Sequence, residues 1–438
     1  MNELHLQDKF LIPFFTNNVN GLGYREVKAN TIGNNLFIEE DVLEFISESL
    51  LNKDNYRKLL RTFANNEKKL IREFIDFLID RAKNYRNMAL FINDNKSVTF
   101  HGLKFHLFYC SGSVTYEDEL FSENIFSVVQ ELPYRFEFEG RQIFSFRPDI
   151  SIFVNGIYLG YSELKSNYNN QNASKNGRAK VIKDYREAAL EYLKISENND
   201  KSEFIRKQFL KIFEKAIHIT STDLEETYII RNIADFFDEI KATHNSGKFD
   251  FENYQLSVQK NFKPYPLMNK EAGKRDKLKE IFTALYSKKM IEKEILYYNF
   301  IEREVVKRDK TREFKNQKGR LISPRPNQKF GVDRIMSKID EFLEHEDDDD
   351  YFINKLRTQL ADLSEDIRNR LINKRMKYLN NKYVYSLLLQ YATGFGKSNI
   401  IGWAALQLKD LRRNGDYVYD KVMLIVDRLQ LRDQLDRK

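Results

Sequence analysis

The chain has 438 residues and a formal net charge of +7, with 72 Lys and Arg against 65 Asp and Glu. Hydrophobic residues make up 42% of it and aromatic residues 13%, which excludes a wholly disordered protein because this much apolar area can offset the entropy lost on folding. The single cysteine excludes a disulfide framework, a thiolate zinc site and an iron–sulfur cluster. At roughly 150 residues per domain, the length indicates about three domains.

The chain contains no stretch of about 18 consecutive apolar residues, and its N-terminus lacks the basic and apolar regions of a signal peptide. We therefore expect a cytoplasmic protein with no membrane partner. The small basic excess is compatible with a nucleic acid partner, although many proteins without one carry a similar charge. Motifs, rather than composition, must therefore indicate the function.

Residues 38–83 carry apolar side chains at the i, i+3, i+4 spacing of amphipathic helices. Farther along, short aromatic and β-branched runs separated by turn residues predict a sheet, and residues 203–216 return to helical spacing. These elements indicate an α/β body that ends near residue 245. The strands are predicted at residues 104–109, 125–129, 134–138, 143–146, 216–221 and 227–230.

Residues 270–320 are strongly charged and are predicted to be helical, with Ile281, Leu285 and Ile295 among the buried positions. Lys and Arg cluster in residues 307–320. The charge pattern favours a solvated helix surface for this basic cluster, and a contact to the DNA backbone is the alternative. We expect this stretch to be a helical connector.

The most informative part of the N-terminal half is residues 147–165. Asn155-Gly156 lies between two β-rich runs and predicts a two-residue hairpin, because a type I′ turn needs positive φ at both positions. Asp149 then begins one strand, and Glu163 and Lys165 end its partner. The period of two along a strand places Glu163 and Lys165 on the same face.

A regular hairpin would leave the two carboxylates apart. Asp149 would face Ser162, and Glu163 would point to the opposite face of the sheet. One extra residue in the second strand would bring Glu163 opposite Asp149. Bulges are common beside active sites, and Gly160 is the natural place for one. We therefore predict a bulge near Gly160, and a regular ladder would contradict a shared site.

Such a site suits hydrolysis of phosphodiester bonds. Asp149 and Glu163 would hold Mg²⁺, which prefers oxygen ligands, polarises the phosphate and lowers the pKa of an attacking water. Lys165 would place a positive charge beside that water and the developing negative charge. The alternative interpretation is a surface hairpin with charged ends, because Glu-x-Lys triplets are common in any chain rich in Lys and Glu.

A second motif, Ala392–Ser398 (ATGFGKS), lies between a predicted buried strand at 383–389 and a predicted helix at 399–408. Strand, glycine loop, Lys-Ser and helix form a phosphate-binding arrangement, in which loop N–H groups and the helix N-terminus bind phosphate and the serine ligates Mg²⁺. Tyr391 replaces the first glycine of the general pattern, but the A-T-G-x-G-K-S form resembles superfamily 2 helicases and translocases. The residues expected to bind ATP here are Thr393, Gly394, Gly396, Lys397 and Ser398, with Ser398 also a metal ligand.

Two more segments fit this interpretation. Pro324–Gln328 precedes a predicted helix and resembles the helicase segment whose glutamine reads adenine, so Gln328 is a further ATP-binding candidate. Residues 422–426 are predicted to form a second buried strand. The chain reaches Lys438 without a Walker B acid after the loop, so we expect it to bind nucleotide but not to hydrolyse it efficiently.

Together, a nuclease-like site and a superfamily 2 loop resemble the restriction (R) subunit of type I restriction-modification enzymes. The resemblance implies a PD-(D/E)XK nuclease domain, with a mixed sheet flanked by helices and the catalytic residues Asp149, Glu163 and Lys165. It also implies that the loop around Lys397 begins a RecA-like motor that translocates DNA. The segments that carry it are 124–130, 147–150, 155–157, 162–165, 216–220, 297–301, 426–428 and Gln434.

The same resemblance extends to the helix after the Glu-x-Lys strand, where the family carries a Q-x-x-x-Y element. Here Tyr185 fits, but Val181 stands at the glutamine position. The basic stretch 166–186 suits phosphate contact, with a mobile solvated loop as the alternative. A further acid from the first helix is common in this nuclease fold, and Glu3 and Asp8 are the candidates. The DNA-contact candidates are Tyr185, Lys183, Lys180 and Arg178.

The resemblance thus predicts an endonuclease and ATP-driven motor subunit that uses Mg²⁺ and ATP, acts on double-stranded DNA and needs methyltransferase (M) and specificity (S) subunits. We expect an endonuclease domain at 1–250, a helical connector at 251–322 and part of the first motor domain at 323–438. Family members are longer, so we expect an N-terminal portion or a natural truncation. The alternatives are a single-chain nuclease-helicase of another defence or repair system, and a non-catalytic DNA-binding or assembly module.

Overall fold

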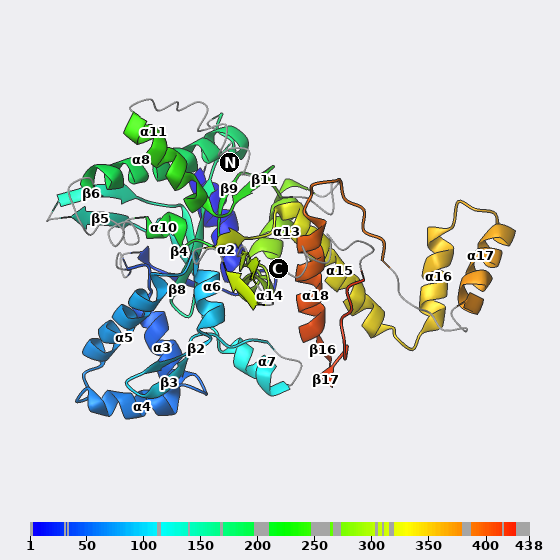
Figure 1. The fold of residues 1–438 in the computed structure, drawn as a ribbon, viewed down its shortest axis with the longest axis horizontal. Helices are drawn as coiled ribbons and strands as arrows, with labels where there is room; N and C mark the ends of the chain where they lie inside the picture. The colour runs from blue at the N-terminus through cyan, green and yellow to red at the C-terminus, as the bar shows by residue number, and fades with distance from the viewer. Residues whose placement is uncertain are drawn as a thin grey trace. The chain divides into compact units, whose positions relative to one another are not determined.

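The fold was analysed in a computed structural model, in which the chain divides into two compact units (Figure 1). The first consists mainly of residues 1–326 and the second mainly of residues 327–411. Among the described residues, no helix is both long enough and apolar enough to cross a membrane. The structure describes residues 3–29, 32, 35–111, 115–138, 141–166, 170–196, 210–246, 263–265, 273–302, 305–308, 311–314, 319–378, 387–413 and 416–425.

The helices predicted for residues 38–83 are present in the first unit. Their apolar stripe is buried, and in α5 it includes Leu70, Phe74 and Leu78. Asn66 caps the N-terminus of α5 by accepting a hydrogen bond from the Lys69 N–H. The N-terminal helices are α1 (Glu3–Leu6), a π-helical turn (Gln7–Leu11), α2 (Ile12–Thr16), α3 (Glu39–Glu48), α4 (Lys53–Thr62), α5 (Glu67–Ala82) and α6 (Met88–Asp94).

A mixed seven-stranded sheet with the order β1-β4-β7-β8-β9-β10-β11 forms the centre of this unit. The pairs β1–β4 and β8–β9 are parallel, and the other neighbours are antiparallel. The strands are β1 (Arg25–Val27), β4 (Phe126–Gln130), β7 (Ile150–Val154), β8 (Ile157–Leu164), β9 (His218–Thr222), β10 (Thr227–Ile230) and β11 (Lys263–Pro264). Two separate hairpins pair β2 (Ser97–Phe100) with β3 (Leu103–His106), and β5 (Tyr134–Phe138) with β6 (Arg141–Phe146).

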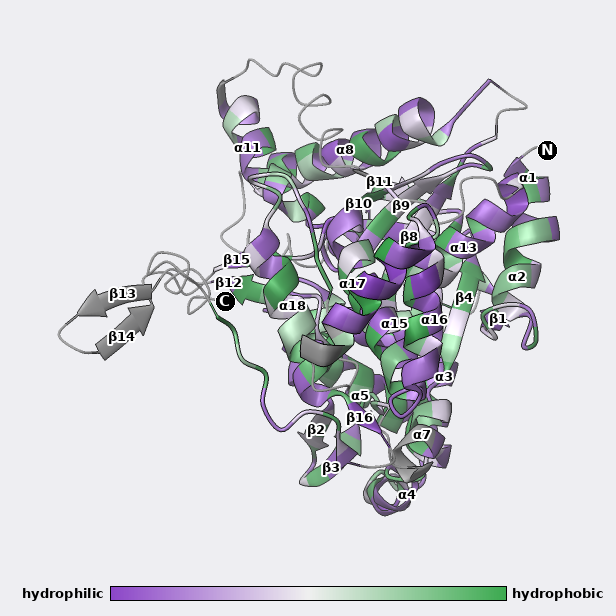
Figure 2. Ribbon diagram, turned by 90° about the vertical axis from the view of Figure 1, so that its right-hand side faces the viewer, coloured by the Kyte–Doolittle hydropathy of each residue, from purple (hydrophilic) through white to green (hydrophobic). Residues whose placement is uncertain are grey.

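Helices cover both faces of the sheet, so the central strands are buried on both sides. In β8, Leu159 joins the core under the N-terminal helices, whereas Tyr158 and Tyr161 join the core under α8. Apolar and polar residues alternate along α8, as Figure 2 shows, and its apolar side packs on the sheet. The helices of this second face are α8 (Arg178–Ser196), α10 (Lys211–Glu214) and α11 (Phe237–Ser246). A short helix, α7 (Thr115–Ser122), precedes β4.

The stretch expected to be a helical connector is helical in its first part. Helices α13 (Lys274–Tyr286) and α14 (Lys288–Leu296) form, and the predicted buried residues Ile281, Leu285 and Ile295 belong to the core of the first unit. The prediction of helix up to residue 320 is wrong, because residues beyond 300 form short strands instead. These are β12 (Phe300–Glu302) with β15 (Arg320–Ile322), and β13 (Val305–Arg308) with β14 (Thr311–Phe314).

The physical reason is local composition. Ile301, Val305 and Val306 are β-branched and Phe314 is aromatic, and such residues favour strands over helices. The charge pattern of this stretch is compatible with either structure, so it could not distinguish them. The side chains of the basic cluster at 307–318 lie outside the described part of the structure, and its possible DNA contact stays a prediction.

In the described part of the second unit, the regular elements are helices. Helix α18 (Lys397–Asp410) includes the predicted helix 399–408 and buries Ile400 and Trp403. The predicted buried strands do not form in their described portions: residues 387–389 and 422–425 have no strand structure, and Leu388 is 94% exposed. A strand needs a hydrogen-bonded neighbour, and no described strand pairs with either segment. The other elements are α15 (Pro326–Glu344), α16 (Asp349–Gln359) and α17 (Glu365–Tyr378), and the short pair β16 (Arg412–Arg413) and β17 (Asp416–Tyr417) lies farther along the chain.

Candidate active site

The hairpin of β7 and β8 has the predicted turn. Asn155 has φ of 47° and Gly156 has φ of 76°, as a type I′ turn requires. A Cβ on Gly156 would lie 2.5 Å from the Ile38 carbonyl oxygen, so a glycine is needed there for space as well as for conformation. The polar side chain of Asn155 is also anchored, because its amide donates to the Leu107 carbonyl oxygen at 2.9 Å.

The predicted bulge is present beside Gly160. Phe153 pairs with Tyr158 but Ile152 pairs with Gly160, so Leu159 is the extra residue in β8. Because Ile150 then pairs with Ser162, the next positions outward are Asp149 and Glu163, which lie opposite each other. The bulge therefore brings the two carboxylates to one face, as the shared-site hypothesis requires.

Gly160 permits this bulge because its backbone lies very close to β9. A Cβ at this position would lie 2.4 Å from the His218 carbonyl oxygen, which belongs to a paired strand and cannot move freely. We expect Gly160→Ala to lower the free energy of unfolding by about 1–3 kcal/mol, measured by urea unfolding. Gly273→Ala is the matched control, since its nearest neighbour would be a side-chain oxygen at 3.6 Å. Equal stabilities of the two variants would contradict the close approach.

Glu163 and Lys165 meet at the end of β8. Lys165 Nζ lies 2.7 Å from Glu163 Oε1 and also donates to the Leu164 carbonyl oxygen at 2.7 Å. The Asp149 carboxylate accepts a hydrogen bond from the Leu164 N–H at 2.6 Å, which holds it at the same place. Both charged side chains are buried, with Glu163 1% and Lys165 8% exposed. The structure thus brings together the three residues predicted as the catalytic set.

A second lysine reaches the same carboxylate from α8. Lys180 Nζ lies 2.7 Å from Glu163 Oε1, so this oxygen contacts two ammonium groups. The approach of α8 depends on Gly177, where a Cβ would lie 2.1 Å from Ser221 Oγ and 3.1 Å from Lys165 Cγ. Lys180 was predicted to contact DNA; its position on Glu163 could not be read from the sequence, because it depends on how α8 docks.

No signal in the sequence singled out Asp184, which follows Lys180 by one helical turn. Burial is the main reason that the pKa of Asp184 rises to about 7; Lys180 opposes the rise, and the Glu163 charge adds to it. Oxygen Oδ2 of Asp184 is buried and has no hydrogen-bond partner among the described residues. The Tyr161 hydroxyl is also buried without a hydrogen-bond partner among the described residues. It interacts electrostatically with Asp184, Glu163 and Asp149. The site is therefore larger than the predicted triad.

Burial is also the main reason that the pKa of Asp149 rises from 3.8 to about 7, and repulsion from Glu163 adds to it. The Leu164 N–H and the two lysines oppose this rise. A cation bound between Asp149 and Glu163 would relieve the repulsion that Glu163 exerts on Asp149.

This shift predicts a pH dependence of stability in the absence of metal. As pH rises from about 4 to about 7, the unfolded chain loses the Asp149 proton before the folded chain does, so the free energy of unfolding falls over this window and is level above it. Asp149→Asn should remove part of the fall, in urea unfolding with EDTA at several pH values. The exposed control Asp76→Asn should retain it. An unchanged profile in Asp149→Asn would show that Asp149 titrates normally.

The residues present fit a divalent cation. Oxygen Oε2 of Glu163 is buried and has no hydrogen-bond partner among the described residues, which would be costly unless a ligand satisfies it. In that part of the chain, no group of three or more His, Cys, Asp or Glu side chains is arranged as a metal cluster. Two carboxylates would leave several coordination positions to water, and Mg²⁺ usually keeps several of its waters when it is bound by one or two carboxylates.

Of the two acids predicted from the first helix, the structure brings only Glu3 to the site. Glu3 Oε1 lies 3.5 Å from Lys165 Nζ, whereas Asp8 is exposed. Gln7, between them, is buried and donates to the Asp149 carbonyl oxygen at 3.3 Å. The first helix thus packs against the start of β7.

The remaining DNA-contact candidates on α8 have different environments. Tyr185 is completely buried and donates to Glu214 Oε1 at 3.1 Å, so its prediction as a DNA contact is wrong for this structure. The reason is the docking of α8, which turns this side of the helix toward the sheet. Lys183 is exposed and lies 3.7 Å from Glu187, and the Arg178 guanidinium lies over the Tyr228 ring. These contacts do not test whether Lys183 or Arg178 binds DNA.

In the second unit, the glycine loop leads directly into α18. Gly394 and Gly396 have φ of 77° and 85°, and Lys397 is the first residue of the helix. Gln328 of α15 is buried and its amide donates to the Phe395 carbonyl oxygen at 2.7 Å. The two segments predicted to bind ATP therefore lie together, with the loop residues Thr393 and Gly394 exposed.

Tyr391, which replaces the first glycine of the general loop pattern, packs at the base of this loop. Its ring stacks on Phe395, with centroids 4.9 Å apart. A Cβ on Gly331 would lie 1.7 Å from the Tyr391 hydroxyl oxygen, so α15 leaves room for the tyrosine by carrying glycine. This contact explains how the loop accommodates the departure from the pattern.

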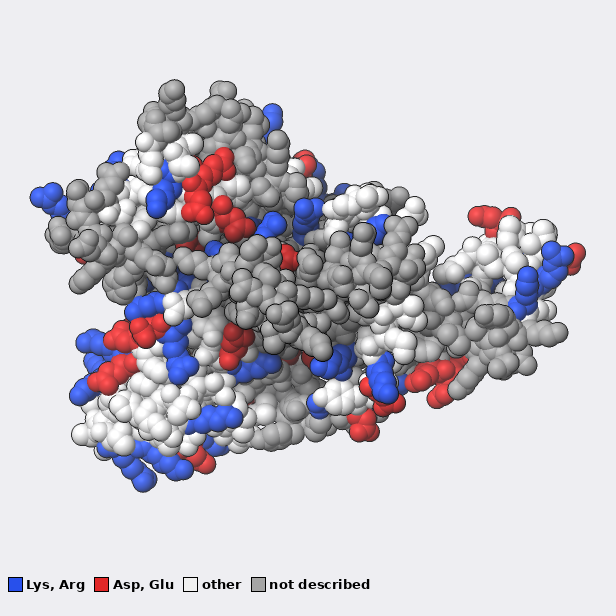
Figure 3. All heavy atoms as spheres, viewed as in Figure 1, with Lys and Arg blue, Asp and Glu red and all other residues white. Residues whose placement is uncertain are grey.

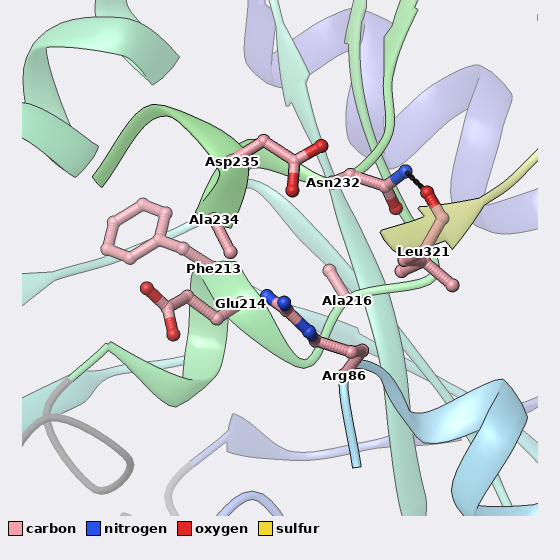
Figure 4. A pocket seen from close by; sticks show the side chains of 8 residues that line it. All are labelled: Arg86, Phe213, Glu214, Ala216, Asn232, Ala234, Asp235 and Leu321. Carbon is pink, nitrogen blue, oxygen red and sulfur yellow. Dashed lines mark hydrogen bonds between the residues drawn. The ribbon is translucent and has the colours of Figure 1, made fainter. Parts of the chain in front are cut away.

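A small cavity lies in the first unit, near the start of β9 (Figure 4). Its volume of about 10 Å³ holds about one water molecule and is too small for a substrate. Asn232 at its edge donates to the Leu321 carbonyl oxygen at 3.2 Å. The lining residues are Arg86, Phe213, Glu214, Ala216, Asn232, Ala234, Asp235 and Leu321.

Fold and site together define a mixed α/β protein with a carboxylate and lysine cluster at the end of a central hairpin. The family model described as type I restriction enzyme R protein N terminus (HSDR_N) matches residues 1–236, more than half of the chain, and this range contains the whole cluster. The chain therefore belongs to this family, which confirms the resemblance seen in the sequence. No match was found among curated proteins.

Proposed function

We propose that this chain is the nuclease-bearing part of a type I restriction subunit, which cleaves double-stranded DNA by Mg²⁺-dependent phosphodiester hydrolysis. The observation that carries the proposal is the β8 bulge beside Gly160, because it brings Asp149 opposite Glu163 and leaves a buried Glu163 oxygen without a partner among the described residues. Bulges are over-represented beside active sites, where they change the direction in which a side chain points.

In this proposal, Asp149 and Glu163 hold the metal and Lys165 stabilises negative charge on the phosphate. When bound, the metal supplies a polarised phosphate and a water of lowered pKa. The buried position of Lys165, on Glu163 and away from bulk water, makes its charge more effective than that of an exposed lysine. Burial of the carboxylates also keeps the geometry of the site in place before DNA arrives.

DNA is the expected substrate, and surface charge supports it. Figure 3 shows basic side chains over the part of the first unit formed by α4 and α5, where exposed Lys and Arg outnumber the acids. Such surfaces attract the phosphate backbone without reading its sequence. Recognition of the target would fall to the methyltransferase and specificity partners, as in the type I systems this chain resembles.

The second unit would supply the ATP-binding part of a DNA-translocating motor. Lys397 and Ser398 at the start of α18 would contact ATP phosphates and Mg²⁺, and Gln328 already lies on the loop. In this proposal the second unit contributes nucleotide binding, and translocation belongs to the type I R subunit as a whole.

Glu163→Gln tests the metal-dependent site. The amide keeps the size of the side chain but is a poorer metal ligand, so the complete enzyme should need at least about tenfold more Mg²⁺ for half-maximal DNA cleavage. Cleavage is followed on plasmid DNA over a range of Mg²⁺ concentrations. Glu187→Gln, on the exposed side of α8, is the control. Equal Mg²⁺ requirements in both variants and the wild type would contradict the proposed site.

A further inference from the structure

Four ionisable groups lie together beside β8 in an arrangement that the catalytic set alone does not explain: Glu163, Lys165, Lys180 and Asp184. Glu163 Oε1 contacts both Lys165 Nζ and Lys180 Nζ at 2.7 Å, whereas Oε2 has no hydrogen-bond partner among the described residues. Asp184 Oδ2 is likewise buried and unpaired within that part of the chain, although Lys180 is near enough to influence it electrostatically. One carboxylate therefore has two cations, and its neighbour has no ion-pair partner in the described structure.

The two lysines differ in how firmly they are held. Lys165 is 8% exposed, donates also to the Leu164 carbonyl oxygen and lies near Glu3. Lys180 is 41% exposed, and Glu163 is its one hydrogen-bonded partner among the described residues. Lys180 is therefore the ammonium that can leave Glu163 at the smaller cost.

Asp184 lies where it can accept the ammonium group of Lys180. Positions 180 and 184 lie one turn apart on the same face of α8, the spacing at which Lys and Asp side chains meet. A change of χ angles in the long lysine side chain is enough to move its ammonium from Glu163 to Asp184, and the backbone of α8 need not shift.

We propose that Lys180 and Asp184 form an exchange pair: Lys180 neutralises Glu163 while the metal is absent and moves to Asp184 when a divalent cation binds Glu163. This inference rests on the proposed Mg²⁺ site. Its physical basis is charge balance, because two lysines and a divalent cation on Glu163 would repel one another in a buried site. Lys180 and Asp184 are positioning residues here, acting through Glu163.

The pair has a consequence for the metal-free protein that can be measured without activity. Lys180→Met removes a partner from buried Glu163, so it should lower the stability of the full chain in EDTA. Asp184→Asn removes a carboxylate that has no partner among the described residues in this state, so it should leave that stability unchanged or raise it. A stability loss in Asp184→Asn equal to that in Lys180→Met would overturn the assignment.

Metal binding gives the decisive test. Mn²⁺ binding to the full chain is measured by the loss of the free Mn²⁺ signal in electron paramagnetic resonance, for the wild type, both single variants and the double variant. Lys180→Met should tighten Mn²⁺ binding several-fold, because the competing ammonium is gone. Asp184→Asn should weaken Mn²⁺ binding about tenfold in the wild-type background. In the Lys180→Met background the same change should weaken Mn²⁺ binding only about threefold or less. Glu187→Gln, the same charge change on the exposed side of α8, is the control.

The outcomes separate the two proposals. If Asp184→Asn weakens Mn²⁺ binding equally in both backgrounds, Asp184 acts only as a distant negative charge and the exchange pair is overturned, while the metal site stands. If the wild type binds no Mn²⁺, or Glu163→Gln binds it as tightly as the wild type does, the proposed metal site fails and the exchange pair fails with it. Strong coupling between positions 180 and 184, together with weaker binding in Glu163→Gln, supports both.

Discussion

Replacing Lys165 with alanine is expected to reduce DNA cleavage by the complete restriction enzyme by about 10²–10³-fold. The Lys165 side chain is 8% exposed and its ammonium lies 2.7 Å from Glu163 Oε1, so in the proposed site it faces the phosphate and is shielded from water. Its loss removes a positive charge from the position where negative charge develops in the reaction. Cleavage is measured on plasmid DNA with saturating Mg²⁺ and ATP, and ATP hydrolysis in the same sample should stay near the wild-type rate.

Because Lys165 also neutralises buried Glu163, its removal could act through stability. Lys165→Met keeps the length of the side chain and is compared in parallel, and urea unfolding shows whether each variant is folded. Lys194→Ala, an exposed lysine on α8 paired with Glu191, is the matched control and should cleave normally. Folded Lys165 variants that cleave within a few-fold of the wild type would remove this residue from the reaction and leave the hairpin without a catalytic lysine.

Lys397→Ala should abolish ATP-dependent translocation and, through it, cleavage of DNA far from the recognition site. Lys397 is exposed at the first position of α18, directly after Gly396 in its left-handed conformation, where it can reach the phosphates of a nucleotide. In phosphate-binding loops of this type the lysine neutralises charge that backbone N–H groups alone cannot balance. In the complete restriction enzyme we expect ATP hydrolysis and cleavage to fall at least about 10²-fold, measured by phosphate release and plasmid cleavage.

Lys409→Ala is the control for this change, because Lys409 is an exposed lysine near the other end of the same helix. Mn²⁺ binding at Glu163 should be unchanged in Lys397→Ala, since the two positions belong to different units of the chain. Unaffected cleavage would indicate a nuclease that works without ATP and would contradict the proposed role of the second unit.

Local signals in the sequence were sufficient to predict most of the hairpin of β7 and β8. Asn155-Gly156 determined the turn, and the period of two then required an extra residue before Glu163 could face Asp149. The structure has that residue at Leu159, next to Gly160. This prediction succeeded because a tight turn fixes register over a few residues, and register follows from counting.

Predictions that depended on tertiary contacts were less accurate. Tyr185 is buried instead of facing DNA, because the direction in which an amphipathic helix presents each residue depends on the sheet it packs against. The charged stretch after residue 300 forms strands, and the apolar segments at 387–389 and 422–425 do not. Strands are stabilised by partners that are distant in the sequence, so an apolar run alone is weak evidence for one.

By itself, the sequence of this protein determined an α/β fold, the hairpin with Asp149, Glu163 and Lys165, and a glycine loop that enters a helix at Lys397. Only the tertiary structure decided that Lys180 shares Glu163 with Lys165 and that a buried oxygen of Asp184 lies near them. The reason is physical: residues within one hairpin are related by short-range geometry, whereas α8 reaches Glu163 because Gly177 allows close contact with β9 and Lys165. The composition of the helix does not encode that distance.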